Sequence, residues 1–161
     1  MIIIAHRGNI DGPSVNENDP IWIDHVISMI IENKIQVTGL EIDVWFQDEK
    51  FFLGHNFPKF EISKGIEWFF EKKEYLWCHA KNIPAFEKLL NANYIKTFMH
   101  DKDDACLTSD GHIWTFPNSE LPLTSRSIAV MPERTNWTFD EILSCQGVCT
   151  DYPNDMNKWH K

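Results

Sequence analysis

Two acidic residues two positions apart, Glu41 and Asp43, are the strongest chemical signal in the sequence. They lie in an apolar run, Leu40 to Trp45, that we predict to be a strand. Because strand side chains alternate between faces, both carboxylates share one face and the intervening apolar residues share the other. If the apolar face packs against helices, the carboxylates point inward, where a divalent cation would offset the cost of burying them. The alternative is a strand whose acidic face is open to solvent.

Other polar residues stand where further apolar runs end. They are His6-Arg7, His55, His79 with Lys81, His100-Asp101, and Asp151. Catalytic side chains of parallel α/β folds gather at the carboxyl ends of the strands, so we expect these groups to share one site. For each histidine the alternative is a structural side chain bonded to a backbone carbonyl, and this explains His79 equally well.

The elements that position these residues follow from hydrophobic periodicity and from capping residues. We predict strands at residues 2–5, 40–45, 51–55, 75–80, 94–100, 113–116, 127–131 and 147–150. We predict helices that begin after Asp19, at 63–73, after Asn82 and at 138–144, and a polar loop at 101–111. This alternation is typical of a parallel α/β sheet, and a barrel would bring all the strand ends to one mouth.

Composition and charge narrow the classes of protein. The 161 residues are 43% hydrophobic and 13% aromatic, which is enough for one globular domain over 1–161. A net charge of −9 and the lack of a Lys/Arg cluster argue against binding to nucleic acid. No apolar stretch is long enough for a membrane span or a signal peptide, so we expect a cytoplasmic protein without a span.

Five short motifs in order resemble the glycerophosphodiester phosphodiesterase family. They are His6-Arg7-Gly8, Glu17-Asn18, Glu41-Ile42-Asp43-Val44, Gly54-His55, and the closing stretch 147–153 with its G-V-x-T-D-x-P pattern. The resemblance implies an α/β fold, a TIM-type (β/α) barrel. Full barrels of this kind have about 200 residues or more, so we expect a reduced barrel with some helices shortened or lost, mainly between residues 100 and 135.

The same resemblance implies roles for individual residues. Glu41 and Asp43 would hold one divalent metal ion with Glu17 beside it, and His6 and His55 would be the acid–base pair. Arg7 would contact phosphate, and Asn18, Lys81 and His100 would lie near the substrate. A metal and an arginine suit the charge that develops when a phosphodiester is attacked, and two histidines can move protons near neutral pH.

The sequence departs from the family pattern in ways that bear on the metal. A later strand of the family carries a Glu-x-Lys segment whose glutamate is a third ligand, and here the segment is His79-Ala80-Lys81. Our hypothesis is that His79 binds the metal or that Glu17 takes that place. Mg²⁺, Ca²⁺ and Mn²⁺ are the candidates, and an imidazole ligand would favour Mn²⁺ or Zn²⁺. The family's insertion after its second histidine is missing, so the resemblance does not imply which substrate this protein uses.

The function predicted from the sequence is metal-dependent hydrolysis of a small phosphodiester. Two alternatives stay open: a non-catalytic module that binds a phosphorylated ligand, and lyase-type cleavage by a hydroxyl of the substrate. The retention of His6, His55, Glu41 and Asp43 together favours an enzyme. The oligomeric state is not predicted.

Overall fold

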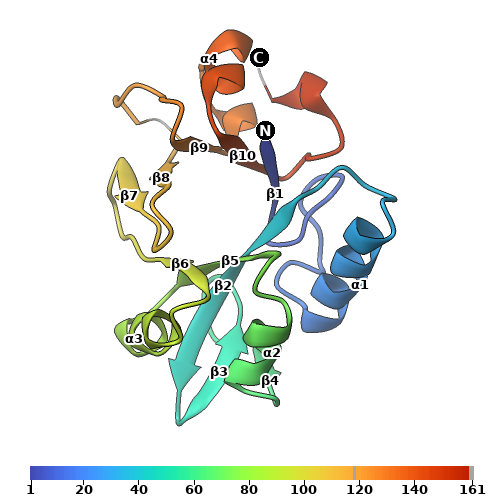
Figure 1. Ribbon diagram of the computed structural model, residues 1–161, viewed down its shortest axis with the longest axis vertical. Coiled ribbons are helices and arrows are strands. Elements are labelled where there is room, and N and C mark those ends of the chain that lie inside the picture. The colour runs from blue at the N-terminus through green and yellow to red at the C-terminus, as the bar shows by residue number, and fades with distance from the viewer. Residues whose placement is uncertain (118, 160–161) are drawn as a thin grey trace.

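The protein is a strand-rich domain with four short α-helices in the part of the chain described by the computed structural model, residues 1–117 and 119–159 (Figure 1). The strands are β1 (Ile2–His6), β2 (Gly39–Gln47), β3 (Lys50–Leu53), β4 (Phe60–Ile62), β5 (Leu76–Ala80), β6 (Lys96–Phe98), β7 (Ala105–Leu107), β8 (Ile113–Thr115), β9 (Ser127–Val130) and β10 (Gly147–Thr150). The helices are α1 (Pro20–Ile31), α2 (Ile66–Glu71), α3 (Ile83–Asn91) and α4 (Phe139–Ser144), with short 3-10 helices η1 (Pro132–Arg134) and η2 (Met156–Lys158).

One mixed sheet contains all ten of these strands. Its main path runs β4-β3-β2-β1-β10-β9-β8-β7, and β5 pairs with β2 and with β6. Seven strands are parallel to one another, in the order β6, β5, β2, β1, β10, β9 and β8. Three further strands pair antiparallel with a neighbour: β3 with β2, β4 with β3, and β7 with β8. The carboxyl ends of the parallel strands therefore point the same way.

The expected TIM-type barrel, even in reduced form, is wrong. The sheet is a curled half-barrel in which β6 pairs with β5 and has no partner on its other side among the described residues. Strand and helix do not alternate throughout: β2-β3-β4 is an antiparallel meander, and β7-β8 is a hairpin where a barrel would place a crossover helix (Figure 1). Parallel neighbours need a crossover connection, whereas a short turn joins β7 to the antiparallel strand β8, so the hairpin ends the barrel pattern.

Two strands were not predicted from the sequence, and helix α2 is shorter than the predicted range of 63–73. The strand β7 lies in the stretch 101–111 that looked like a polar loop, and β4 follows His55. Helix α2 begins at Ile66 after Gly65, whose positive φ of 58° breaks the helical run from Ser63. The other helix starts agree with the prediction, because Asp19, Asn82 and Thr138 each cap a helix with the side chain.

The apolar core lies mainly on the helix side of the sheet. Leu40, Ile42 and Val44 of β2 are fully buried there with Ile23 of α1 and Phe69 of α2. A second cluster covers the inner face and contains Ile4, Trp77, Phe98, Trp114, Ile128 and Cys149. No helix in the described ranges is long and apolar enough to cross a membrane.

Gly54, just before His55, offers a test of this fold. Its φ is +150°, and a Cβ there would lie 2.3 Å from the backbone oxygen of Phe57. We predict that Gly54→Ala lowers the free energy of unfolding by about 2–4 kcal/mol, from backbone strain plus a clash. The control is Gly65→Ala, where φ is +58° but the space is open, with an expected cost of about 1 kcal/mol. Urea denaturation measures both, and equal losses would contradict the turn geometry.

Candidate metal and phosphate site

The alternation of strand side chains places a polar layer directly above the apolar inner layer. His6 follows Ile4 by two residues, His79 follows Trp77, His100 follows Phe98 and Asp151 follows Cys149. Residues two apart on a strand share a face, so β1 and β5 each present an apolar side chain and then a polar one toward the carboxyl end. His100 lies just beyond the end of β6, and Asp151 directly follows β10. The inner layer is thus the floor of the site.

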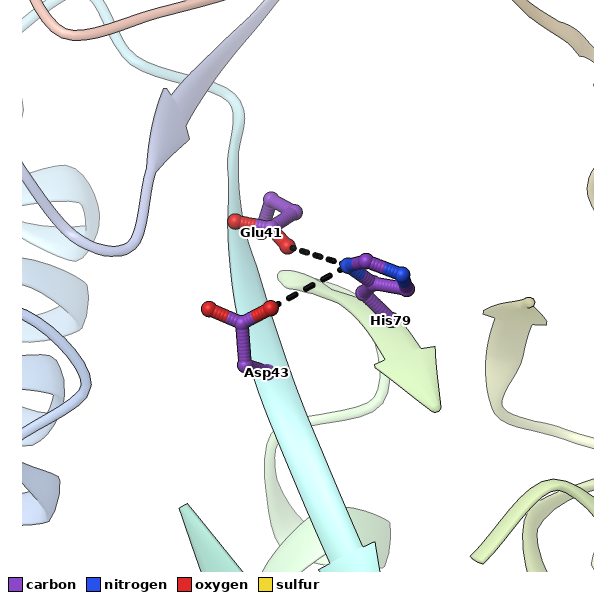
Figure 2. Close-up of side chains that lie close together, drawn as sticks. All are labelled: Glu41, Asp43 and His79. Atoms are coloured by element: carbon purple, nitrogen blue, oxygen red, sulfur yellow. Dashed lines mark ion pairs between the residues drawn. The ribbon is translucent and has the colours of Figure 1, made fainter. Parts of the chain in front are cut away.

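Strand register brings the acidic residues of β2 beside the histidines of its neighbours. His6 of β1 pairs with Glu41, and His79 of β5 pairs with Asp43. Glu41 is 3% exposed and Asp43 is 1% exposed, which excludes the solvent-facing alternative. Figure 2 shows both carboxylates directed toward the His79 ring, whose Nδ1 lies 3.7 Å from Glu41 Oε1 and 3.1 Å from Asp43 Oδ1.

These three side chains form a group that could hold a metal ion. One ligand atom from each of Glu41, Asp43 and His79 lies within 4.8 Å of the others. Asp43 Oδ1 is buried without a hydrogen-bond partner, although His79 Nδ1 and Lys81 Nζ lie within 3.3 Å at ion-pair distance. An acceptor oxygen left without a hydrogen bond in a buried acidic site fits a position that a cation would fill.

The charges around Asp43 keep it ionised. Burial alone would raise its pKa, but the His79, Lys81 and Arg7 cations beside the carboxylate outweigh burial and lower it. His79 behaves in the opposite sense: burial would lower the pKa of the imidazole, and its contacts with Asp43 and Glu41 raise it instead. Without a metal, the imidazolium therefore supplies part of the positive charge that two buried carboxylates require.

A tight turn after β1 aims Arg7 across the carboxylates. Arg7 and Gly8 both have positive φ, and a Cβ at Gly8 would lie 2.7 Å from Ile23 Cδ1, so the turn requires glycine there. The backbone N–H of Arg7 donates to Glu41 Oε2 at 3.1 Å. Arg7 Nε lies 3.2 Å from Asp43 Oδ2. Burial alone would lower the pKa of Arg7, but the carboxylates of Glu41 and Asp43 raise it, so the guanidinium is charged.

Glu17 and Asn18 support these groups. Glu17 accepts hydrogen bonds from Arg7 Nη1 and Asn9 Nδ2, and it lies outside the three-residue group of potential ligands. Asn18 is buried, accepts from the backbone N–H of Asp43 and donates to Asp43 Oδ2 at 2.9 Å. Of the two hypotheses for the third ligand, the geometry favours His79 over Glu17.

His6 is oriented by Asp151, a strand-end residue that the sequence placed near the same site but to which it gave no role. Its Nδ1 lies 2.7 Å from Asp151 Oδ1, and Asp151 also accepts from Asn9 Nδ2 and Arg134 Nη2. Burial alone would raise the pKa of Asp151, but these partners lower it, so the carboxylate accepts and His6 Nδ1 donates. Nε2 of His6 lies 4.0 Å from Glu41 Oε2, beyond hydrogen-bond distance, and is therefore available for proton transfer. In the sequence, only the position of Asp151 at a strand end pointed to its place in the site. No sequence feature pointed to the roles of Asn9 and Arg134.

The other predicted site residues line one cavity of about 430 Å³. Its polar lining comprises His6, Arg7, Glu41, His55, His79, Lys81, His100 and Asp101. The exposed His55 follows Gly54, whose backbone N–H donates a hydrogen bond to the backbone oxygen of Asp43. Partial burial and the Arg7 charge lower the pKa of His55. His100 stacks on His79 with ring centroids 4.6 Å apart, and burial followed by the His79 charge lowers its pKa to about 4. The structure thus brings all four predicted histidines to one cavity.

Comparison with protein-family models, curated proteins and solved structures gave no match. The resemblance to glycerophosphodiester phosphodiesterases therefore depends on the motifs alone.

Removal of a ligand tests the metal group. We predict that the protein binds one Mn²⁺ ion and that Asp43→Asn weakens this binding by more than about a hundredfold, because loss of outer-shell partners alone costs about 10- to 100-fold. Asp140→Asn, which changes an exposed acid on α4, should leave the affinity unchanged. Isothermal titration calorimetry measures both, and equal affinities would show that the ion binds elsewhere.

The raised pKa of His79 makes metal binding dependent on pH. Below that pKa, which lies above the ordinary 6.5, a bound metal must displace a proton from His79. The affinity for Mn²⁺ should therefore rise about tenfold per pH unit up to that pKa and then level off. Titrations in the range of about pH 5.5 to 8.5 would measure the slope, which His79→Ala should remove. A slope that persists in the variant would assign the proton to another group.

Proposed function

We propose that this protein cleaves a small phosphodiester with the help of one divalent metal ion. The observation that supports this best is the buried group of Glu41, Asp43 and His79 beside Arg7 and His6 in a single cavity. The group combines ligands for a metal, cations for a phosphate and an oriented imidazole. Those are the components that phosphodiester cleavage requires.

The ligand set fits a divalent cation, because two carboxylates and an imidazole surround an acceptor oxygen that lacks a hydrogen bond. When bound, the metal would supply Lewis-acid stabilisation of charge on the phosphoryl oxygens. Mg²⁺ and Ca²⁺ prefer oxygen ligands alone, whereas Mn²⁺ and Zn²⁺ accept imidazole readily. His79 therefore makes Mn²⁺ or Zn²⁺ the better candidates.

Arg7 and Lys81 would bind the phosphate. Both side chains are about four-fifths buried, both line the cavity, and both contact Asp43 at 3.2–3.3 Å. A cation in the ligand group would take over the neutralisation of Asp43, so the guanidinium and ammonium could turn to the phosphate. Buried cations bind anions more strongly than exposed ones because water screens them less.

His6 and His55 would transfer the protons. The Asp151 carboxylate fixes His6 Nδ1 as a donor, so Nε2 can take a proton from the attacking hydroxyl or water. His55 lies on the exposed rim of the same cavity, where its imidazole can take up a proton from solvent and donate it to the leaving alcohol. Because its pKa is lowered, this protonated form is the minor one near pH 7.

The substrate in this proposal is a small molecule. The net charge of −9 and the lack of a Lys/Arg cluster disfavour nucleic acid, and the cavity has the size of a small-molecule site. A cytoplasmic location is part of the proposal. Product analysis separates hydrolysis from lyase-type cleavage, because only the lyase route gives a cyclic phosphate.

The test is turnover of a panel of phosphodiesters by metal-stripped protein refilled with Mg²⁺, Ca²⁺, Mn²⁺ or Zn²⁺. We expect metal-dependent turnover, with His6→Ala lowering kcat at least about a hundredfold through loss of proton transfer. Asp151→Asn should lower kcat less and shift its pH profile, since His6 stays but loses its orientation. His25→Ala, on the exposed side of α1, is the matched control and should retain full activity. Metal binding without turnover of any diester would favour a binding module.

A further inference from the structure

The cavity has a second side that the proposed chemistry does not use. It is apolar and comes from the carboxyl ends of β8 and β9. Its residues are Trp114, Phe116, Pro117, Val130 and Met131. A site built only to hold a metal and a phosphate would not need an apolar wall, so this side points to the organic part of the ligand.

Aromatic rings dominate this wall and are held in place. The centroids of the Phe116 and His100 rings are 3.7 Å apart, and the two rings are inclined by 31°. Phe116 is half-buried, and its backbone N–H donates to the oxygen of Asp104 at 2.9 Å. The β7–β8 hairpin therefore fixes Phe116 at the edge of the cavity, where a planar ring could stack on it.

His100 makes the wall partly polar. Its half-buried imidazole lines the cavity beside Phe116. A heteroaromatic ring with donor or acceptor atoms at its edge can form hydrogen bonds with an imidazole, whereas an aliphatic chain cannot.

The charges of the cavity disfavour a cationic group on the ligand. Glu41 lines the same space, but a divalent ion bound to Glu41 and Asp43 would offset the carboxylate charge and leave the cations Arg7 and Lys81. Asp101 also lines it, but that carboxylate is exposed, so solvent and salt screen its charge. A neutral ring therefore suits the wall better than a quaternary ammonium headgroup, although aromatic walls can bind either.

We propose that this wall binds a neutral heteroaromatic ring, of the nucleobase class, carried by one alcohol group of the phosphodiester. The proposal uses the site described above for the phosphate, and adds the substrate class. The substrate would then be a nucleotide-derived diester, with its phosphate at Arg7 and Lys81 and its base against Phe116. The cavity of about 430 Å³ lies within the range of small-molecule sites.

The experiment compares adenosine 5′-monophosphate with ribose 5-phosphate, which share the phosphate and the sugar and differ by the base. Binding to the full-length protein in the presence of Mn²⁺ is measured by isothermal titration calorimetry. We expect the nucleotide to bind about tenfold more tightly or better, as base stacking on an aromatic side chain provides. Phe116→Leu should abolish this difference, and Phe116→Tyr, which keeps the ring, should retain it.

Phe57→Leu is the matched control, because Phe57 is exposed and lies outside this cavity. Equal binding of the two compounds, no binding of either, or a preference that survives Phe116→Leu would overturn the proposal. Since binding is measured without turnover, the two proposals can fail separately. A preference for the base in a protein without diesterase activity would refute the enzyme and keep the subsite, and activity without the preference would do the reverse.

Discussion

The burial of two carboxylates side by side on β2 is the constraint on which the site depends. Glu41 and Asp43 are almost inaccessible, and two buried like charges destabilise a fold unless opposite charge and hydrogen bonds compensate them. The compensation comes from separate elements: Arg7 after β1, Asn18 before α1, and His79 with Lys81 from β5. Strand order and register are therefore tied to the chemistry, because β1, β2 and β5 must be neighbours for these groups to meet.

The parts of the site that follow from local pattern could be predicted from the sequence. A period of two fixed the faces of β2, since Leu40 and Ile42 face the helices and Glu41 and Asp43 do not. Capping residues located the starts of three helices because their side chains replace missing backbone partners. The convergence of His6, His79 and His100 followed from strand direction, as parallel strands end at the same edge. His55 reaches the same cavity from the antiparallel strand β3, which strand direction does not explain.

The features that were missed depend on contacts between distant segments. Asp151 meets His6 across 145 positions of sequence, and no local pattern assigns that partner. The reduced barrel was wrong in part because residues 101–111, expected to be a polar loop, contain β7, which pairs antiparallel with β8. Short strands have weak periodicity, and their pairing is decided by tertiary packing. The same hairpin holds Phe116 in place, so the apolar wall of the cavity could not be predicted without it.

The central claim is that Glu41, Asp43 and His79 bind a metal and are not simply an ion-pair network with Arg7 and Lys81. The most direct test is a crystal structure of the protein soaked in Mn²⁺, with anomalous diffraction recorded at a wavelength that excites manganese. Our account predicts one strong anomalous peak at bonding distance, about 2.0–2.4 Å, from an oxygen of each carboxylate and from a nitrogen of His79. A peak elsewhere, or none, with Asp43 still paired to Arg7 and Lys81, would contradict it.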